Sequence, residues 1–190
     1  MWRKNMLFLF AAAFILILAA CGSSGAEDED DEIASEGGQY TAAVDMINSE
    51  EEEAGTAEII QAEDGNVTIQ LDLSGLPADS THGIHLHQTG ECTAPDFESA
   101  GDHYNPTDAE HGTDSEGGPH VGDLPNIETD ENGEVTTELD ASDEIVVDRL
   151  EDNSLFDDDN TAIVVHENAD DYETQPSGDS GDRIACGVVE

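Results

Sequence analysis

The chain has 190 residues, of which 47 are Asp or Glu and only 4 are Lys or Arg, for a formal net charge of -43 at pH 7. This charge excludes a nucleic-acid-binding protein, because phosphate contacts require clustered Lys and Arg side chains. It indicates high solubility and a protein suited to a saline (halophilic) habitat, and it points to no cationic partner.

The first 21 residues have the features of a lipoprotein signal. Arg3 and Lys4 precede an apolar run over 6–20, which is shorter than the roughly 20 residues that span a bilayer comfortably. The pentapeptide Leu-Ala-Ala-Cys-Gly over 18–22 resembles a bacterial or archaeal lipobox, in which the cysteine becomes the lipidated first residue of the mature protein. We therefore expect an extracytoplasmic protein that Cys21 anchors to the cell membrane. An ordinary secretory signal with a chance cysteine is the alternative.

A polar, strongly acidic stretch follows the signal. Residues 22–38 consist almost entirely of Gly, Ser, Ala, Asp and Glu, and such a segment cannot bury enough apolar surface to offset its chain entropy. The stretch therefore predicts a disordered tether that its own charge repulsion extends. The remaining residues, 39–190, have the length of one domain and show no internal repeat.

Apolar residues in 39–190 mostly alternate with polar ones, which is typical of strands with one buried face. The dipeptides Asp64-Gly65 and Asn132-Gly133 predict turns between neighbouring strands. Because helical periodicity is almost absent, an all-β antiparallel sandwich or barrel is favoured. Strands are expected over 40–47, 56–61, 67–73, 134–139, 161–166 and 184–189.

Two long segments, about 88–120 and 167–183, do not fit this strand pattern. Connections longer than about 15 residues are usually functional or disordered, and both of these touch a set of histidines. Histidine is the commonest metal ligand, because neutral imidazole offers a nitrogen lone pair near neutral pH. Six of the seven histidines and one aspartate are candidate ligands: His85, His87, His103, His111, His120, Asp123 and His166.

His85 and His87 lie two residues apart on an expected strand, and residues at i and i+2 project from the same face. Both rings could therefore bind one metal ion, although alternate histidines also occur on solvated strand faces. His166 ends the strand expected over 161–166, where a histidine could equally be held by a hydrogen bond alone.

His103, His111 and His120 lie on the first long segment, with Asp123 close behind. Three histidines and a carboxylate make a credible tetrahedral zinc site, with the carboxylate as the hard fourth ligand. A histidine-rich loop on its own could also bind metal adventitiously. The order and spacing of the whole set favour two metal sites that share one ligand.

Five segments together resemble the copper/zinc superoxide dismutases, over about residue 40 to the C-terminus. These segments are GIHLH, GDHYNP, HVGDL, VVHENADD and GDRIACGV, in the order that the family shows. The resemblance implies a Greek-key antiparallel β-sandwich or barrel, one copper and one zinc ion per subunit, and an enzyme that disproportionates superoxide to dioxygen and hydrogen peroxide. It leaves open whether the chain is a monomer or a homodimer.

The resemblance also implies roles for individual residues. Copper would be bound by His85, His87, His103 and His166. Zinc would be bound by His103, His111, His120 and Asp123. His103 would therefore bridge the two metals and carry a proton during turnover. Asp170 would join His85 and His111 by hydrogen bonds, and Arg183 would attract superoxide beside copper.

With Cys21 assigned to lipid, Cys92 and Cys186 are left as a pair. Outside the cytoplasm such a pair is expected to oxidise, and the resemblance implies that these two form a disulfide; a reduced pair is the alternative. The family counterpart of His82 is a packed structural histidine, so His82 is not expected to bind metal. The segment 167–183 is acidic here, whereas many relatives carry lysines there that guide substrate, which puts long-range attraction of superoxide in doubt.

Two other functions are open on the sequence alone. The first is a surface lipoprotein of the same fold that binds copper and zinc without turnover, as in relatives that have lost copper ligands. The presence of all four copper histidines argues against it. The second is a copper-only enzyme, against which the intact set of His111, His120 and Asp123 argues.

Overall fold

The computed structural model describes residues 39–148, 154–156 and 159–190. The signal predicted over 1–21 and the tether predicted over 22–38 lie outside the described residues. In the described part of the chain, no helix combines the length and the apolar composition needed to cross a membrane.

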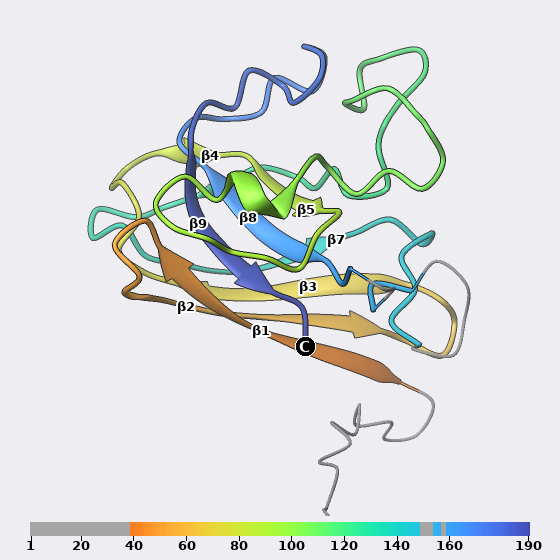
Figure 1. Cartoon of the computed structure of the whole chain (residues 1–190), viewed down its shortest axis with the longest axis horizontal. Coiled ribbons are helices and arrows are strands. Elements are labelled where there is room, and N and C mark those ends of the chain that lie inside the picture. Colours follow the sequence, from red (N-terminus) through yellow and green to blue (C-terminus); the bar gives the residue numbers. More distant parts are fainter. Residues whose placement is uncertain (1–38, 149–153, 157–158) are drawn as a thin grey trace, which may run out of the picture. The chain divides into compact units, whose positions relative to one another are not determined.

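The regular structure in the described part of the chain consists of antiparallel strands and one 3-10 turn, η1 (Glu98–Ala100), with no α-helix. The strands are β1 (Tyr40–Asn48), β2 (Glu53–Gln61), β3 (Val67–Leu73), β4 (Thr81–His82), β5 (Ile84–His87), β6 (Ile127–Glu128), β7 (Val135–Asp140), β8 (Ala162–His166) and β9 (Arg183–Val188). Seven of them form one sheet in the order β5-β8-β9-β1-β2-β3-β7, and β4 pairs with β6. Figure 1 shows that this sheet curls, so that β8 and β9 cross above β1, β2 and β3. The predicted all-β antiparallel fold class is confirmed.

The alternation of side chains explains why the sheet folds around a core. In β3 the apolar residues at every second position are buried, whereas Gln70 and Asp72 between them are exposed. β1 and β2 bury one face in the same way, and their inward side chains pack against those of β3 and β8 in one cluster. β5 and β8 differ because every one of their residues is buried, so the histidines that they carry lie inside the protein.

The strands predicted from the sequence agree with the structure to within a few residues. The prediction over 67–73 coincides with β3, and the one over 56–61 is shorter than β2 because Glu53 to Gly55 continue the pairing with β1. The two-residue strands β4 and β6 were not expected, because two residues show no periodicity.

The two long loops lie on the side of the sheet away from β1 and β2 (Figure 1). The first loop and the residues just after it run beside β5. The Leu86 N–H donates to the carbonyl of Gly122 at 2.9 Å, and the Leu86 carbonyl accepts the N–H of Tyr104 at 2.8 Å. The second loop bonds to the first through Asp114, whose backbone N–H donates to the carbonyl of Tyr172 at 3.0 Å. The first loop carries His103, His111 and His120, and the second loop directly follows His166. Both loops therefore lie next to the predicted ligands on β5 and β8.

Candidate metal centre

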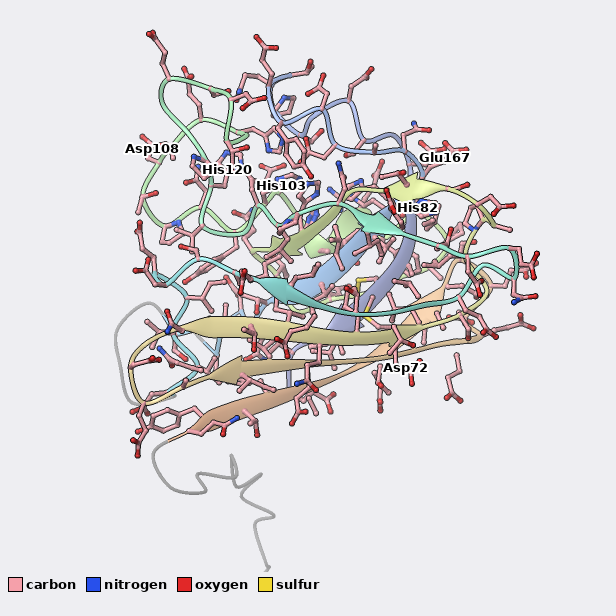
Figure 2. The ribbon with its side chains drawn as sticks, turned by 180° about the vertical axis from the view of Figure 1, so that it is seen from behind. Asp72, His82, His103, Asp108, His120 and Glu167 are labelled. Atoms are coloured by element: carbon pink, nitrogen blue, oxygen red, sulfur yellow. A yellow bond between two sulfur atoms is a disulfide. The ribbon has the colours of Figure 1, made fainter. Side chains whose placement is uncertain are left out.

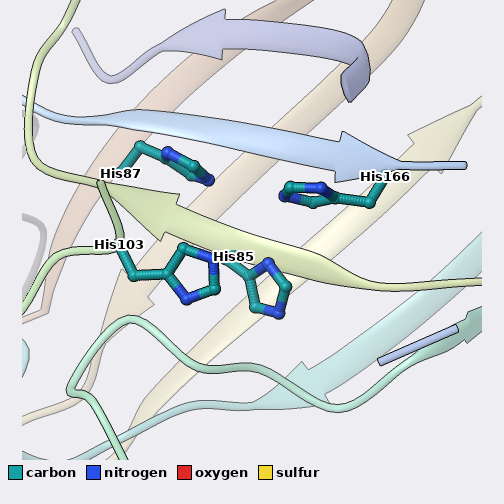
Figure 3. Close-up of side chains that lie close together, drawn as sticks. All are labelled: His85, His87, His103 and His166. Atoms are coloured by element: carbon teal, nitrogen blue, oxygen red, sulfur yellow. The ribbon is translucent and has the colours of Figure 1, made fainter. Parts of the chain in front are cut away.

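Strand pairing brings three histidines from distant parts of the chain together. β5 and β8 are antiparallel neighbours, with His85 opposite Val164 and His87 opposite Ala162. His85 and His87 project from the same face of β5, and His166 extends from the end of β8, where the pairing with β9 shifts register. Figure 3 shows these three rings turned toward one another.

His103 reaches the same place from the first long loop. An isolated bridge pairs it with His87, and its ring stacks on that of His85 with 3.9 Å between ring centroids. All four side chains of this copper cluster are buried, and one ligand atom from each lies within 4.8 Å of the others. The copper cluster is His85, His87, His103 and His166.

Each ring of the copper cluster has one nitrogen with a partner and one without. His87 Nδ1 donates to the carbonyl of Gly101 at 2.9 Å, and His166 Nδ1 is 3.4 Å from the carbonyl of Gly181. Those contacts fix the ring orientations and leave the opposite nitrogens free. Within this cluster the buried nitrogens without a hydrogen-bond partner are His85 Nδ1, His87 Nε2, His103 Nε2 and His166 Nε2; outside the cluster, His82 Nε2 is a further such atom among the described residues. Four convergent buried lone pairs are a costly arrangement for a metal-free protein and a suitable one for a metal ion.

A second group, the zinc cluster, consists of His103, His111, His120 and Asp123. Asp123 Oδ1 lies 2.9, 3.1 and 3.2 Å from the Nδ1 atoms of the three histidines, in that order. Ligands of a tetrahedral zinc ion at about 2.0 Å are about 3.3 Å apart, so these spacings fit a closed zinc site. The other oxygen, Oδ2, accepts the backbone N–H of Gly112 and of His120 and so fixes the carboxylate.

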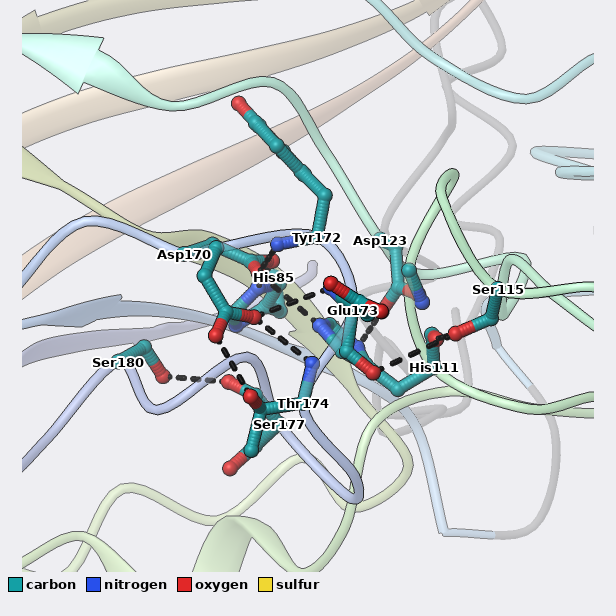
Figure 4. Close-up of polar contacts among 12 residues, drawn as sticks. His85, His111, Ser115, Asp123, Asp170, Tyr172, Glu173, Thr174, Ser177 and Ser180 are labelled. Carbon is teal, nitrogen blue, oxygen red and sulfur yellow. Dashed lines mark hydrogen bonds and ion pairs between the residues drawn. The ribbon is translucent and has the colours of Figure 1, made fainter.

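Asp170 connects the two clusters (Figure 4). Its Oδ2 accepts from His85 Nε2 at 2.8 Å, and its Oδ1 accepts from His111 Nε2 at 3.0 Å. The backbone N–H of Tyr172 donates to the same Oδ1 at 2.7 Å. Gly178 packs directly on this carboxylate with φ 69°, and a Cβ at that position would overlap Asp170 Oδ1.

Burial keeps the copper cluster neutral in the metal-free protein. Desolvation lowers the pKa of His103 to about 4 and that of His166 to about 3. It also lowers the pKa of His85 and places that of His87 well below its usual value. The lone pairs are therefore available at neutral pH, with no proton to displace.

His111, in the zinc cluster, differs from the copper cluster because its pKa is raised. Burial opposes its charged form, but hydrogen bonds with Asp123 and Asp170 outweigh burial and raise the pKa of His111 to about 9. Burial likewise disfavours the two carboxylates as anions, yet bonds from His103 and His111 to Asp123, and from His111 and His85 to Asp170, hold both carboxyl pKa values low. In the metal-free protein His111 is therefore a cation between two anions.

Arg183 is the only Lys or Arg in the described part of the chain. Its Nη1 and Nη2 donate to the carbonyls of Phe97 and Gly101, at 2.6 and 2.7 Å. Because Gly101 also accepts from His87, one carbonyl fixes the guanidinium relative to the copper cluster. Arg183 lines a cleft of about 610 Å³ that four of the histidines also line: His87, His103, His120 and His166.

The predicted disulfide is present. Cys92 and Cys186 are joined across 94 residues of sequence, so the first long loop is fixed to β9. In the chain-entropy model a loop of this size is worth about 4.6 kcal/mol. His82 is fully buried, and its Nδ1 donates to the carbonyl of His166 at 2.8 Å, as a packed structural histidine would.

Some residues that build the site gave no signal in the sequence. The carbonyls of Gly101 and Gly181 orient histidine rings, but any residue has a carbonyl. Asn126 bonds to the backbone of Asp170, and Gln175 bonds to the backbone of His111. Nothing in the sequence distinguishes these two amides from other polar residues near them. Their roles depend on how the two loops meet, which sequence spacing does not specify.

A buried cluster of histidine lone pairs beside a three-histidine carboxylate site defines a binuclear metalloprotein with an antiparallel β fold. The family described as copper/zinc superoxide dismutase (SODC) matches residues 53–189. The chain therefore belongs to the copper/zinc superoxide dismutase family, whose cofactors are copper and zinc.

Individual relatives agree with this assignment. "Superoxide dismutase [Cu-Zn] 1" of Aquifex aeolicus is 42% identical over 146 residues, covering 77% of this chain and 85% of the relative. "Superoxide dismutase-like protein YojM" of Bacillus subtilis is 39% identical over 146 residues, covering 77% of this chain and 74% of the relative.

Two solved structures are similar in fold. A variant of a SOD-like protein from Bacillus subtilis, with a tyrosine and a proline each changed to histidine, gives a TM-score of 0.74 at 39% identity, covering 77% of this chain and 95% of that one. The Cu/Zn superoxide dismutase from Brucella abortus gives 0.64 at 27% identity, covering 79% of this chain and 99% of that one.

The protonated state of His111 predicts that zinc binding is coupled to pH. Zinc must displace the proton on His111 Nδ1, so below the pKa of about 9 the affinity for zinc should rise with pH, by about tenfold per unit for one proton. Competition with a chelator, with metal-free protein at pH 6, 7 and 8, measures this slope. Calorimetry in two buffers counts the protons released, and zinc affinity independent of pH would contradict the prediction.

Proposed function

We propose that this chain is a copper/zinc superoxide dismutase that acts outside the cytoplasm, converting two superoxide ions and two protons into dioxygen and hydrogen peroxide. The observation that best supports the proposal is the position of His103. Its Nε2 is one of the free nitrogens of the copper cluster, while its Nδ1 lies in the zinc cluster. One imidazole with its two nitrogens in two metal clusters suits a bridged pair of ions.

The residues divide the work between the two clusters. Copper bound by its four histidines would supply the one-electron oxidation and reduction, whereas zinc has no redox chemistry. His103 Nε2 is the atom at which a proton would be held and passed to the reduced product. Arg183 presents a fixed guanidinium in the cleft, which suits it to orient a small anion.

A metal-binding protein without turnover is the competing function. No described feature favours it, since all four rings of the copper cluster converge and Arg183 lines the cleft beside them. Loading with one copper and one zinc per chain, followed by a superoxide-consumption assay, separates the two functions. Stoichiometric metal without dismutation would refute the proposed enzyme.

We assign the protein to the outer face of the cell membrane through a lipid on Cys21. The lipobox supports this, and the disulfide between Cys92 and Cys186 fits an oxidising compartment. Replacing Cys21→Ser should move the protein from the membrane fraction to the soluble fraction and abolish incorporation of labelled fatty acid. Unchanged membrane association in that variant would contradict the anchor.

Single-ligand variants should separate the two metals. His166 lies in the copper cluster alone, whereas His103 belongs to both clusters. For His166→Ala we expect dismutation to vanish while zinc stays bound, and copper affinity to fall by more than the roughly 10- to 100-fold that removal of a residue behind a ligand costs. For His103→Ala we expect both metals to be affected. Near-normal activity of His166→Ala at stoichiometric copper would disprove the ligand assignment.

The acidic surroundings of the cleft predict an unusual salt dependence. Asp102 and Asp108 line the cleft, and Asp102, Glu98 and Asp96 interact electrostatically with Arg183. Negative charge there repels superoxide over distances that salt screens, since the Debye length falls from about 30 Å at 0.01 M to about 3 Å at 1 M. The catalytic efficiency kcat/KM should therefore rise with salt.

Variants that replace one aspartate by asparagine test which carboxylates cause the salt dependence of kcat/KM. Asp102→Asn should raise kcat/KM at low salt about two- to fivefold, because unit charges a few ångströms apart in water interact by about 0.5–1 kcal/mol, and should flatten the salt response. Asp72→Asn is the matched control, since Asp72 is exposed on β3, away from the loop side that carries Asp108 and His120 (Figure 2). Metal content and circular dichroism must be constant across the series. A fall in kcat/KM with salt, or equal effects of the two variants, would contradict the prediction.

A further inference from the structure

Gln175, on the second long loop, holds both backbone polar groups of one zinc-cluster residue. Its Oε1 accepts the N–H of His111 at 2.8 Å, and its Nε2 donates to the carbonyl of His111, also at 2.8 Å. The same Nε2 is 3.1 Å from Ser115 Oγ and 3.2 Å from the carbonyl of Glu173. The Gln175 side-chain amide thus pairs with His111 from the opposite loop as a neighbouring strand would.

His111 needs such support because no regular structure holds it. It lies in neither a helix nor a strand, yet its fully buried ring must meet Asp123 with one nitrogen and Asp170 with the other. The next residue, Gly112, has φ 88° and is packed so closely on the carbonyl of Tyr172 that a Cβ would overlap it. Two hydrogen bonds from one planar amide fix the height and the tilt of the backbone that carries the ring.

A second two-point contact of the same kind holds Asp170, on the second long loop, from a residue that follows the first long loop. Asn126 Oδ1 accepts the N–H of Asp170 at 2.8 Å, and Asn126 Nδ2 donates to the carbonyl of Asp170 at 2.9 Å. His111 and Asp170, which bond to each other through their side chains, are thus each held at the backbone by a side-chain amide. Gln175 holds His111, and Asn126 holds Asp170. The repetition of the same two-point contact makes an incidental surface contact by Gln175 a poor explanation.

Gln175 also adjoins the substrate cleft. The next two residues, Pro176 and Ser177, line the cleft together with His103, His120 and Arg183. A displacement of Gln175 would therefore move the wall of the cleft as well as His111.

We infer that Gln175 is a positioning residue for the zinc cluster. It holds the backbone of His111 in place and thereby also fixes the adjoining cleft wall, Pro176 and Ser177, relative to His111. The inference rests on the proposed zinc site. It assigns Gln175 no contact with metal or substrate.

Two variants and one control test it. Gln175→Met keeps the length of the side chain and loses both bonds to His111. Gln175→Glu keeps the acceptor for the His111 N–H but sets an oxygen against the His111 carbonyl. Gln70→Met is the matched control, because Gln70 is an exposed glutamine on β3 whose Nε2 donates to Glu138 at 3.1 Å. Each protein is prepared as the full chain with the Cys92–Cys186 disulfide formed.

Three measurements report on the positioning. Zinc affinity is obtained by chelator competition, the visible spectrum of cobalt bound in place of zinc reports the geometry of the ligands, and amide hydrogen exchange reports the His111 N–H directly. We expect Gln175→Met and Gln175→Glu to weaken zinc binding about tenfold, to shift the cobalt bands and to speed exchange at His111. Gln70→Met should match the wild type in all three.

The outcomes are distinguishable. If the wild type binds zinc stoichiometrically and both Gln175 variants stay within twofold of its affinity with an unchanged cobalt spectrum, the inference is wrong while the proposed function stands. If the variants lose thermal stability in the metal-free state but keep the cobalt spectrum, Gln175 is a general stabiliser and the inference is equally wrong. If the wild type binds no zinc, the zinc assignment fails and the inference fails with it.

Discussion

The rest of the structure depends on one constraint, that a buried imidazole needs partners for both of its nitrogens. A neutral ring donates with one nitrogen and keeps a lone pair on the other. For His85, His87 and His166 the protein supplies an acceptor for the donating side, from Asp170 or from backbone carbonyls. It supplies nothing for the opposite side, where the lone pairs converge. Burial lowers the pKa of each ring, so no proton competes for that space, and coordination is what offsets the cost of burial.

The sheet and the loops meet this constraint in different ways. β5 and β8 place their rings by strand geometry, and hydrogen bonds to Asp170 and to backbone carbonyls then fix the ring orientations. The loops place carboxylates and the rings of His111 and His120, and they do so through side-chain bonds to backbone. Asp123 joins His103 and His111 within the first loop, whereas Asp170 joins His85 of β5 to His111. The carboxylate of Asp170 therefore positions the loops relative to the strands and shapes both clusters.

Much of this could be predicted from the sequence, for reasons visible in particular residues. The alternation in 67–73 gives the bounds of β3, because every second residue enters the core. The pair His85 and His87 shares a face because a strand has a period of two. In contrast, no pattern in one chain shows that Gly178 must lack a side chain to approach Asp170, or that Gln175 faces His111. Those contacts arise between loops, where the chain follows no repeating geometry and tertiary packing alone decides the neighbours.

Among the residues that the structure describes, β7 is the last strand of the curled sheet and has a strand partner on one side only, which has a consequence for association between molecules. An unpaired strand edge can recruit the edge of another copy. Here Glu138 and Asp140 are exposed on a strand of only six residues, so two such edges repel each other in dilute buffer. Salt at molar concentration screens that repulsion. At such salt concentrations the shortness of β7 would oppose edge-to-edge pairing of two copies more than its charge would.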